Sequence, residues 1–287
     1  MTMGARFLFS LLVLLAQIPT ALAAPFVTPA WRLDAVTGVD ALPGNFRVLP
    51  ALAASGSGQP TLEGMRPLAA RLRAVAGNRR IYIIDLRQES HGYLLTAAGQ
   101  AYAVSWHTAM NAANRGRDAA AVQQDEQQRL AAAVSTEVTA SPMGRFDLAS
   151  GMRPVTFRAA AYETEAQAAA AAGLIPVRIA ATDMRWPEPA AIDAFLAFYD
   201  ELPSDAWLHF HCQAGMGRTT TFLVLTELLR HPELPLSDAL SHQLAAGGAD
   251  LRLRPEIMAG LSLFSQYARE RRAGAPRWSE WLARHDG

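Results

Sequence analysis

Apolar runs alternate with segments of helical periodicity along most of the chain, which predicts a layered fold. Buried strands are expected at residues 81–84, 175–180 and 207–210, where β-branched and aromatic residues gather. Helices are expected over residues 61–76, 163–172, 189–199, 218–230, 236–246 and 255–272. Because these strands and helices alternate, the chain is expected to be an α/β protein with a central sheet flanked by helices.

Residues 93–160 depart from this alternation. They hold short alternating runs on both sides of a polar, Ala- and Gln-rich helix at about 118–133. The runs are 101–106, 134–139 and 155–159. We interpret this segment as a small, β-rich insertion.

The segment before the first predicted helix, residues 24–60, is rich in Pro, Gly, Ala and Ser. This composition predicts an extended, loop-rich stretch. Within it, the Ser-Gly-Ser-Gly stretch at residues 55–58 is expected to form a turn, with a phosphate-contacting loop as the alternative.

The first 23 residues carry the three-part pattern of a signal peptide. Arg6 supplies the positive region, residues 7–16 form an apolar run too short to span a bilayer comfortably, and Ala21-Leu22-Ala23 offers small residues for cleavage. A buried N-terminal helix or an uncleaved anchor is the alternative. Cleavage predicts a periplasmic or secreted protein without a membrane partner.

Composition narrows the chemistry further. The 26 basic and 26 acidic residues balance, so the chain lacks the net charge with which proteins coat nucleic acids. Every basic residue is Arg, which excludes a Schiff-base lysine and a Walker-type phosphate loop. A single Cys excludes an intrachain disulfide and a cysteine zinc cluster, and the seven His lack zinc-peptidase spacing. No metal and no cofactor are expected.

The segment with the clearest chemistry contains the single Cys. It reads His211-Cys212-Gln213-Ala214-Gly215-Met216-Gly217-Arg218-Thr219, between a predicted strand and a predicted helix. Inward-facing backbone N–H groups of such a loop and a helix N-terminus bind anions, and the guanidinium of Arg218 can hold two phosphate oxygens. The same positive field favours the thiolate of Cys212, a nucleophile aimed at phosphorus, and Thr219 could hydrogen-bond that sulfur. An inert buried Cys at an ordinary strand–helix turn is the alternative.

This segment resembles the signature of the cysteine-dependent tyrosine phosphatases. The resemblance implies a general acid on a separate loop, which protonates the leaving oxygen. Asp183 stands in such a loop, 29 residues before Cys212, with Trp186-Pro187 close behind it. A helix-capping Asp is the alternative interpretation.

Further motifs resemble the bacterial phosphatase-like (cysteine) phytases, and the likeness runs from about Leu42 to Trp281. They are the stretches at residues 85–92, 104–106, 195–199 and 207–212. The resemblance implies a tyrosine-phosphatase-like core, residues 24–92 and 161–287, interrupted by a small partial β-barrel at 93–160. It also implies a small-molecule substrate, inositol hexakisphosphate (phytate) and lower inositol polyphosphates, hydrolysed stepwise through a cysteinyl-phosphate.

The resemblance also suggests residues that hold the substrate. In the catalytic loop these are Gln213, Ala214, Gly215, Met216 and Gly217, whereas His211, directly before the nucleophile, is expected among the catalytic residues. Outside it they are Arg47, which matches a pocket-lining segment, then Arg87, Glu89, His91 and Met184, with Arg252 and Arg254 as a basic rim. Relatives often carry His and Glu where this chain has Met184 and Gln213. A structural ion pair, a loop hydrogen bond or a solvated surface is the alternative for the charged residues.

Three functions therefore stay open. The first is a phytase, the second a tyrosine or dual-specificity protein phosphatase with the same chemistry, and the third an inositol-phosphate-binding module without activity. A basic rim favours a substrate with many phosphates, whereas phosphotyrosine requires an aromatic slot. The presence of Cys212, Arg218, Thr219 and Asp183 argues against the inactive module.

Overall fold

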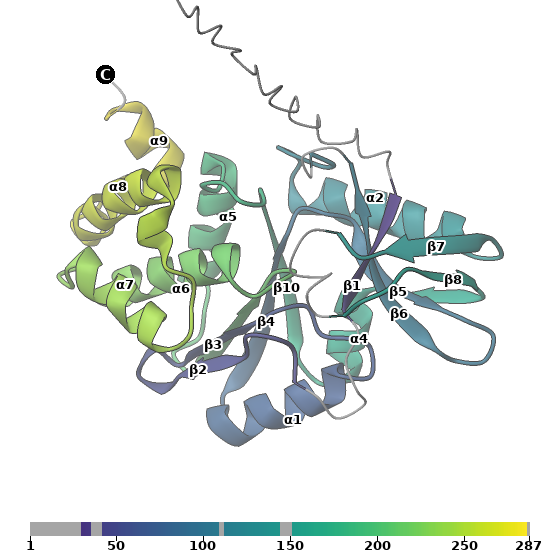
Figure 1. The fold of residues 1–287 in the computed structure, drawn as a ribbon. Coiled ribbons are helices and arrows are strands. Elements are labelled where there is room, and N and C mark those ends of the chain that lie inside the picture. Colours follow the sequence, from purple (N-terminus) through teal and green to yellow (C-terminus); the bar gives the residue numbers. More distant parts are fainter. Residues whose placement is uncertain (1–29, 36–41, 109–111, 144–150, 286–287) are drawn as a thin grey trace, which may run out of the picture.

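A five-stranded sheet forms the centre of the molecule (Figure 1). The computed structural model describes residues 30–35, 42–108, 112–143 and 151–285. The strands of this sheet lie in the order β10 (Ile175–Ala181), β4 (Arg80–Arg87), β11 (Ala206–His211), β3 (Ala54–Ser57) and β2 (Arg47–Leu49). The first four strands run parallel and β2 is antiparallel, so the carboxyl ends of β4, β10 and β11 meet at one edge.

A second, six-stranded sheet lies beside this core (Figure 1). Its order is β8 (Val155–Arg158), β7 (Glu137–Ser141), β1 (Ala30–Ala35), β6 (Ala101–His107), β5 (His91–Leu95) and β9 (Ala161–Glu163). This sheet draws on more of the chain than residues 93–160, because β1 pairs with both β6 and β7. The assignment of 93–160 as an inserted domain stays a prediction.

Helices cover both faces of the central sheet (Figure 1). One face carries α5 (Pro189–Asp200), α6 (Gly217–Arg230), α7 (Leu236–Ala245), α8 (Pro255–Arg272) and α9 (Trp278–Ala283). The other face carries α1 (Met65–Ala76) and α4 (Glu165–Ala171), whereas α2 (Ala119–Ala133) packs on the second sheet. Short 3₁₀ turns at Pro50–Leu52 (η1) and Leu251–Leu253 (η3) complete the described elements.

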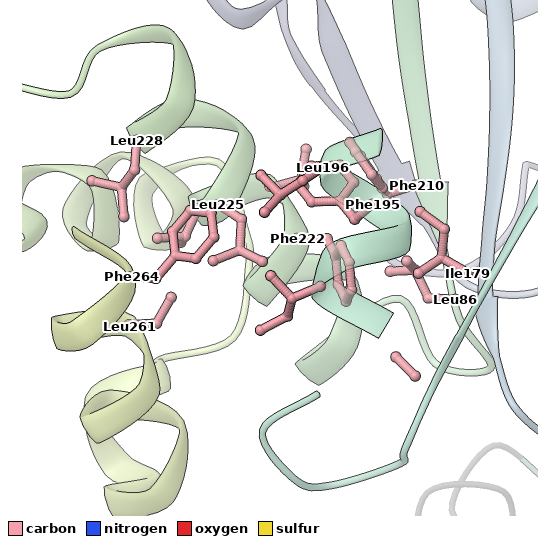
Figure 2. Packing of buried hydrophobic residues seen from close by; sticks show 14 of the residues in the cluster. Leu86, Ile179, Phe195, Leu196, Phe210, Phe222, Leu225, Leu228, Leu261 and Phe264 are labelled. Carbon is pink, nitrogen blue, oxygen red and sulfur yellow. The ribbon is translucent and has the colours of Figure 1, made fainter. Parts of the chain in front are cut away.

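The core explains why the strands hold their positions. Side chains alternate along a strand, so Leu208 and Phe210 of β11 point toward α5 and α6, while Trp207 points toward α1. Figure 2 shows Phe195 of α5 and Phe222 of α6 packed against the sheet side chains; their ring centroids lie 5.2 Å apart. Helix α6 is therefore enclosed along most of its length, which anchors the loop before it.

The turn expected at residues 55–58 is wrong, because residues 54–57 form the buried strand β3. A side chain at Gly56 would meet the Thr219 methyl group at 2.7 Å, so glycine allows β3 and α6 to pack closely. Ser55 and Ser57 direct their hydroxyls to the ring of His209 on the neighbouring strand. The strand lacks large apolar residues because its small side chains fit beneath a helix and its hydroxyls have a buried partner.

The other predicted strands and helices of the core are confirmed with ends that differ by at most four residues, and with them the α/β class. The loop-rich prediction for residues 24–60 missed β1, β2 and β3. The predicted signal peptide, residues 1–23, lies outside the described residues. Within the described part of the chain, no helix combines the length and apolar character that crossing a bilayer requires.

Candidate active site

The loop between β11 and α6 turns sharply around Gly215. This residue has φ 73°, a left-handed conformation that favours glycine. A Cβ here would lie 2.3 Å from the carbonyl carbon of Ser57, so the loop rests directly on the end of β3. Loop residues 213–216 thus lie between the carboxyl ends of the strands and the first turn of α6.

We expect Gly215→Ala to destabilise the protein by more than the roughly 1–2 kcal/mol that a left-handed conformation costs an L-residue, because the added methyl group overlaps the backbone of Ser57. Thermal unfolding measures the effect. Gly217→Ala is the matched control, because a Cβ at Gly217 meets no atom within 4 Å. Equal unfolding temperatures for the two variants would contradict the close approach at Gly215.

The Cys212 side chain directly follows β11 and is 4% exposed. Thr219 Oγ1 donates a hydrogen bond to Cys212 Sγ at 3.3 Å. Three positive groups attract a charge on this sulfur: Arg47 on β2, His211 on β11 and Arg218 on α6. Apolar side chains also pack around Cys212, so its sulfur lies in a buried site with three cationic neighbours.

Arg218 is held in place by carboxylates. Its Nη1 and Nη2 donate to the two carboxylate oxygens of Glu89 at 2.8 and 2.9 Å, a bidentate pair. Its Nη2 also lies 3.2 Å from Oδ1 of Asp183. Burial disfavours the charge of Arg218, but Glu89, Asp183 and Cys212 outweigh it and raise its pKa well above the ordinary value.

The acid loop follows β10 and places Asp183 beside Arg218, with 31% of the Asp183 side chain exposed. The next residue, Met184, has φ 59° and is 67% exposed. Trp186 anchors the loop: its backbone N–H donates to Glu256 Oε1 at 3.3 Å, and its ring lies against Gly260 of α8. The nucleophile candidate, its arginine and its acid candidate therefore meet at one edge of the sheet, from three elements.

Glu89, expected to contact substrate, lies beneath the loop as the partner of Arg218. Its neighbours hold it firmly: Arg87 Nε lies 3.6 Å from Oε2, and Arg178 Nη2 donates to the Glu89 carbonyl at 2.7 Å. Burial raises the pKa of Glu89, but Arg218 and Arg87 more than reverse this and hold it well below the ordinary value. Glu89 therefore stays ionised and orients the guanidinium of Arg218.

Arg87 and Arg47 are also buried, on opposite sides of the loop. Arg87 is fully buried, donates to Asp34 Oδ2 at 2.7 Å on β1, and so ties the second sheet to the core. Arg47 Nη1 donates to the Gly215 carbonyl at 2.7 Å, and its Nη2 donates to Thr220 Oγ1 at 3.1 Å. Burial lowers the pKa of Arg47 to about 10, with Cys212 acting in the opposite direction.

The loop is fastened at two further points. Asn45 Nδ2 donates to the Ala214 carbonyl at 2.7 Å, and Gln213 Nε2 donates to the Asp34 carbonyl at 3.2 Å. With Arg47, these contacts make a frame of side chains around the backbone of the loop. Its shape is therefore set before any ligand arrives.

Two histidines lie behind the loop. His211 Nε2 lies 2.6 Å from Glu165 Oε1, and His91 Nε2 lies 3.2 Å from Glu165 Oε2. His91 Nδ1 also contacts the Glu89 carbonyl at 2.8 Å. Burial disfavours the charged form of each ring, but neighbouring carboxylates outweigh burial and raise the pKa of both His91 and His211.

The basic rim expected at η3 lies at the surface. The Arg252 guanidinium pairs with Asp250 at 2.7 Å, and Arg254 is exposed. Three residues of the buried ionic network were not predicted from the sequence as part of the site: Asp34, Glu165 and Arg178. The available signal was weak: each is a charged residue within or at the end of an otherwise apolar element.

Comparison with known proteins agrees with this geometry. A sequence profile of the PTP-like phytase family, described by the words inositol hexakisphosphate, matches residues 84–230. The tandemly repeated protein tyrosine phosphatase like phytase from Mitsuokella multacida superposes with a TM-score of 0.78 and 31% identity, over 88% of this chain and 49% of that one.

Two further solved structures are similar. The PTP-like myo-inositol phosphatase from Mitsuokella multacida, in complex with myo-inositol-(1,3,4,5)-tetrakisphosphate, has a TM-score of 0.77 and 31% identity, again over 88% and 49% of the two chains. A PTP-like phytase from Bdellovibrio bacteriovorus has a TM-score of 0.70 and 24% identity, over 91% and 97%. The chain thus spans about half the length of the Mitsuokella proteins, and the expected tyrosine-phosphatase-like fold is confirmed.

Proposed function

Since the profile match covers half of its length, the chain belongs to the PTP-like phytase family, and we propose that it hydrolyses phosphomonoesters of inositol polyphosphates through a cysteinyl-phosphate. One observation carries the proposal. Glu89 and Asp183 engage the two terminal nitrogens of Arg218, while its buried Nε has no hydrogen-bond partner among the described residues. That N–H belongs to a guanidinium that interacts electrostatically with Cys212, and it is suited to an oxygen of a bound phosphate.

In the first step the Cys212 sulfur attacks phosphorus, and the bond from phosphorus to the inositol oxygen breaks. Asp183 gives its proton to that oxygen, which leaves as a hydroxyl. Arg218 and the loop N–H groups stabilise the negative charge on the three remaining oxygens. The product is a phosphoryl group bonded to sulfur.

In the second step a water oxygen attacks the same phosphorus, and Asp183, now a carboxylate, takes a proton from it. The sulfur–phosphorus bond breaks and its electron pair returns to Cys212 as a thiolate. The hydrogen bond from Thr219 to the sulfur stabilises this leaving group. No step requires a metal ion.

Family membership supports inositol polyphosphates as substrates, as does the tetrakisphosphate bound by the Mitsuokella protein. We expect kcat/KM for inositol hexakisphosphate to exceed that for a phosphotyrosine peptide by about 100-fold or more, because several phosphates add binding energy outside the reacting one. Steady-state kinetics with chromatography of the products measures this ratio and shows whether hydrolysis is stepwise. A higher value for the peptide would favour the protein phosphatase, and binding without turnover would favour the inactive module.

We also propose that the protein acts in the periplasm or outside the cell, because residues 1–23 carry the pattern of a signal peptide. N-terminal sequencing of the protein from a periplasmic extract tests this. A first residue at position 24 supports export, whereas an intact Met1 in the cytoplasmic fraction contradicts it.

A further inference from the structure

Glu165 is a buried carboxylate at the start of α4, outside the catalytic loop. The helix begins after Thr164, whose side chain accepts from the N–H of Gln167 in a capping box. This cap places Glu165 in the first helical turn with only 5% of the residue exposed. An ionised carboxylate in such a position requires cationic or donor partners.

The partners of Glu165 come from three separate segments of the chain: β11, β5 and the loop after β3. Its Oε1 lies 2.6 Å from Nε2 of His211, and its Oε2 lies 3.2 Å from Nε2 of His91. Gln59 donates its side-chain N–H to Oε2. Burial raises the pKa of Glu165, but His211 and His91 more than reverse this, so the carboxylate is ionised. The shorter of the two histidine contacts leads to the residue directly before the nucleophile.

We propose that Glu165 is a positioning residue that holds His211 as an imidazolium beside Cys212, and so keeps the sulfur in its reactive thiolate form. This rests on the proposed function, because Cys212 needs a thiolate only if it is the nucleophile. A buried cation next to the sulfur stabilises the thiolate electrostatically, and the cation persists only while a carboxylate balances its burial.

The groups that face His211 determine its charge. Glu165 faces it from α4 and Asp85 from β4, where Asp85 is its register partner, and Cys212 follows it on its own chain. His91 shares Glu165 with it, and Arg178 pairs with Asp85 at 3.2 Å.

His209, two residues earlier on β11, faces the same side of the sheet. Burial, His211 and Arg47 lower its pKa to about 3, so His209 is neutral at physiological pH. Ser57 of β3, the register partner of His211, directs its hydroxyl to Nε2 of His209. His209 therefore adds no cation that could replace the imidazolium of His211.

Carboxylates raise the pKa of His211, so the imidazolium is present below that pKa and is lost as the pH rises through it. Removing the charge of Glu165 lowers the pH at which His211 loses its proton. At the pH values where Cys212 becomes a thiolate, the sulfur then has a neutral ring beside it. The thiolate should therefore form at a higher pH.

Glu165→Gln tests this, with Glu163→Gln as the matched control that removes the same charge two residues away. The chain has a single Cys, so iodoacetamide labelling followed against pH reports Cys212 alone. We expect Glu165→Gln to move the labelling midpoint and the acid limb of kcat/KM upward by about 1 pH unit. Glu163→Gln should move neither. An unchanged midpoint in folded Glu165→Gln protein would overturn the proposal.

A double-mutant cycle separates this role from general support of the fold. If Glu165 acts through His211, adding Glu165→Gln to His211→Asn should cause no further shift of the labelling midpoint. A further shift of about 1 pH unit in the double variant would show that Glu165 does not act through the ring. A merely structural role would lower stability without moving the midpoint.

Should Glu165→Gln fail to fold, ¹⁵N NMR of the wild-type histidines decides the question. We expect both ring nitrogens of His211 to carry protons at pH 7, and a neutral ring at that pH overturns the proposal. Labelling and NMR use no phosphate ester, so failure of the proposed substrate and failure of this proposal give different results. If the labelling midpoint shifts as expected but inositol phosphates are not hydrolysed, only the proposed substrate is rejected.

Discussion

Cys212→Ser is expected to lower kcat for inositol hexakisphosphate by about 10⁴-fold or more, while substrate binding persists. A hydroxyl has a much higher pKa than a thiol, so the cations around position 212 cannot keep Ser ionised near neutral pH. Because side chains of Asn45, Arg47 and Gln213 shape the loop, its amides should still bind phosphate. Steady-state kinetics and calorimetric titration with the substrate measure the two quantities.

A chemical trap provides the control for this variant. Acid quenching of wild-type protein during turnover should yield a fraction of chains whose mass has increased by one phosphoryl group at Cys212. The Ser variant should give none within the same time. Turnover by Cys212→Ser at the wild-type rate would show that the sulfur does not attack phosphorus, and the proposed mechanism would fail.

The core elements were predictable because their signal is local. Strands β4 and β11 contain the apolar runs 81–84 and 206–208, and α8 begins at Pro255 and keeps its periodicity to Arg272. Strand β3 was not predictable, since its Ala-Ser-Gly-Ser sequence matches a turn, and only the approach of α6 and the ring of His209 make it a strand. Tertiary packing overrode local propensity there.

In the candidate site, too, the residues with a local sequence signal were predictable and those placed by long-range contacts were not. The loop from Cys212 to Arg218 is contiguous, so its residue types and spacing alone point to anion binding. The residues around it are joined by long-range contacts that no local pattern contains. Glu89 and Glu165 meet Arg218 and His211 only because parallel strands bring distant segments to one sheet edge. Sequence reasoning identified Glu89 as a charged candidate, but not which side of the loop it occupies.

Asp183→Asn is expected to slow hydrolysis of inositol phosphates by about 100- to 1,000-fold, and hydrolysis of p-nitrophenyl phosphate by only about tenfold. The inositol oxygen leaves as a basic alkoxide unless it is protonated, whereas p-nitrophenolate is stable as an anion. The difference between the two substrates therefore measures proton donation. Initial rates of the wild-type protein and of Asp183→Asn, each measured with both substrates, give this comparison.

The contact between Asp183 and Arg218 makes the comparison of substrates necessary. Asp183 Oδ1 lies 3.2 Å from Arg218 Nη2, so its replacement could also disturb the guanidinium. Arg218 acts on the phosphoryl oxygens, which are the same in both substrates, so such a disturbance would slow both equally. Asp205→Asn, which removes a carboxylate from an exposed pair with Arg80, should leave both rates unchanged. Equal slowing of the two substrates by Asp183→Asn would assign this residue to holding Arg218 and leave the general acid to be found elsewhere.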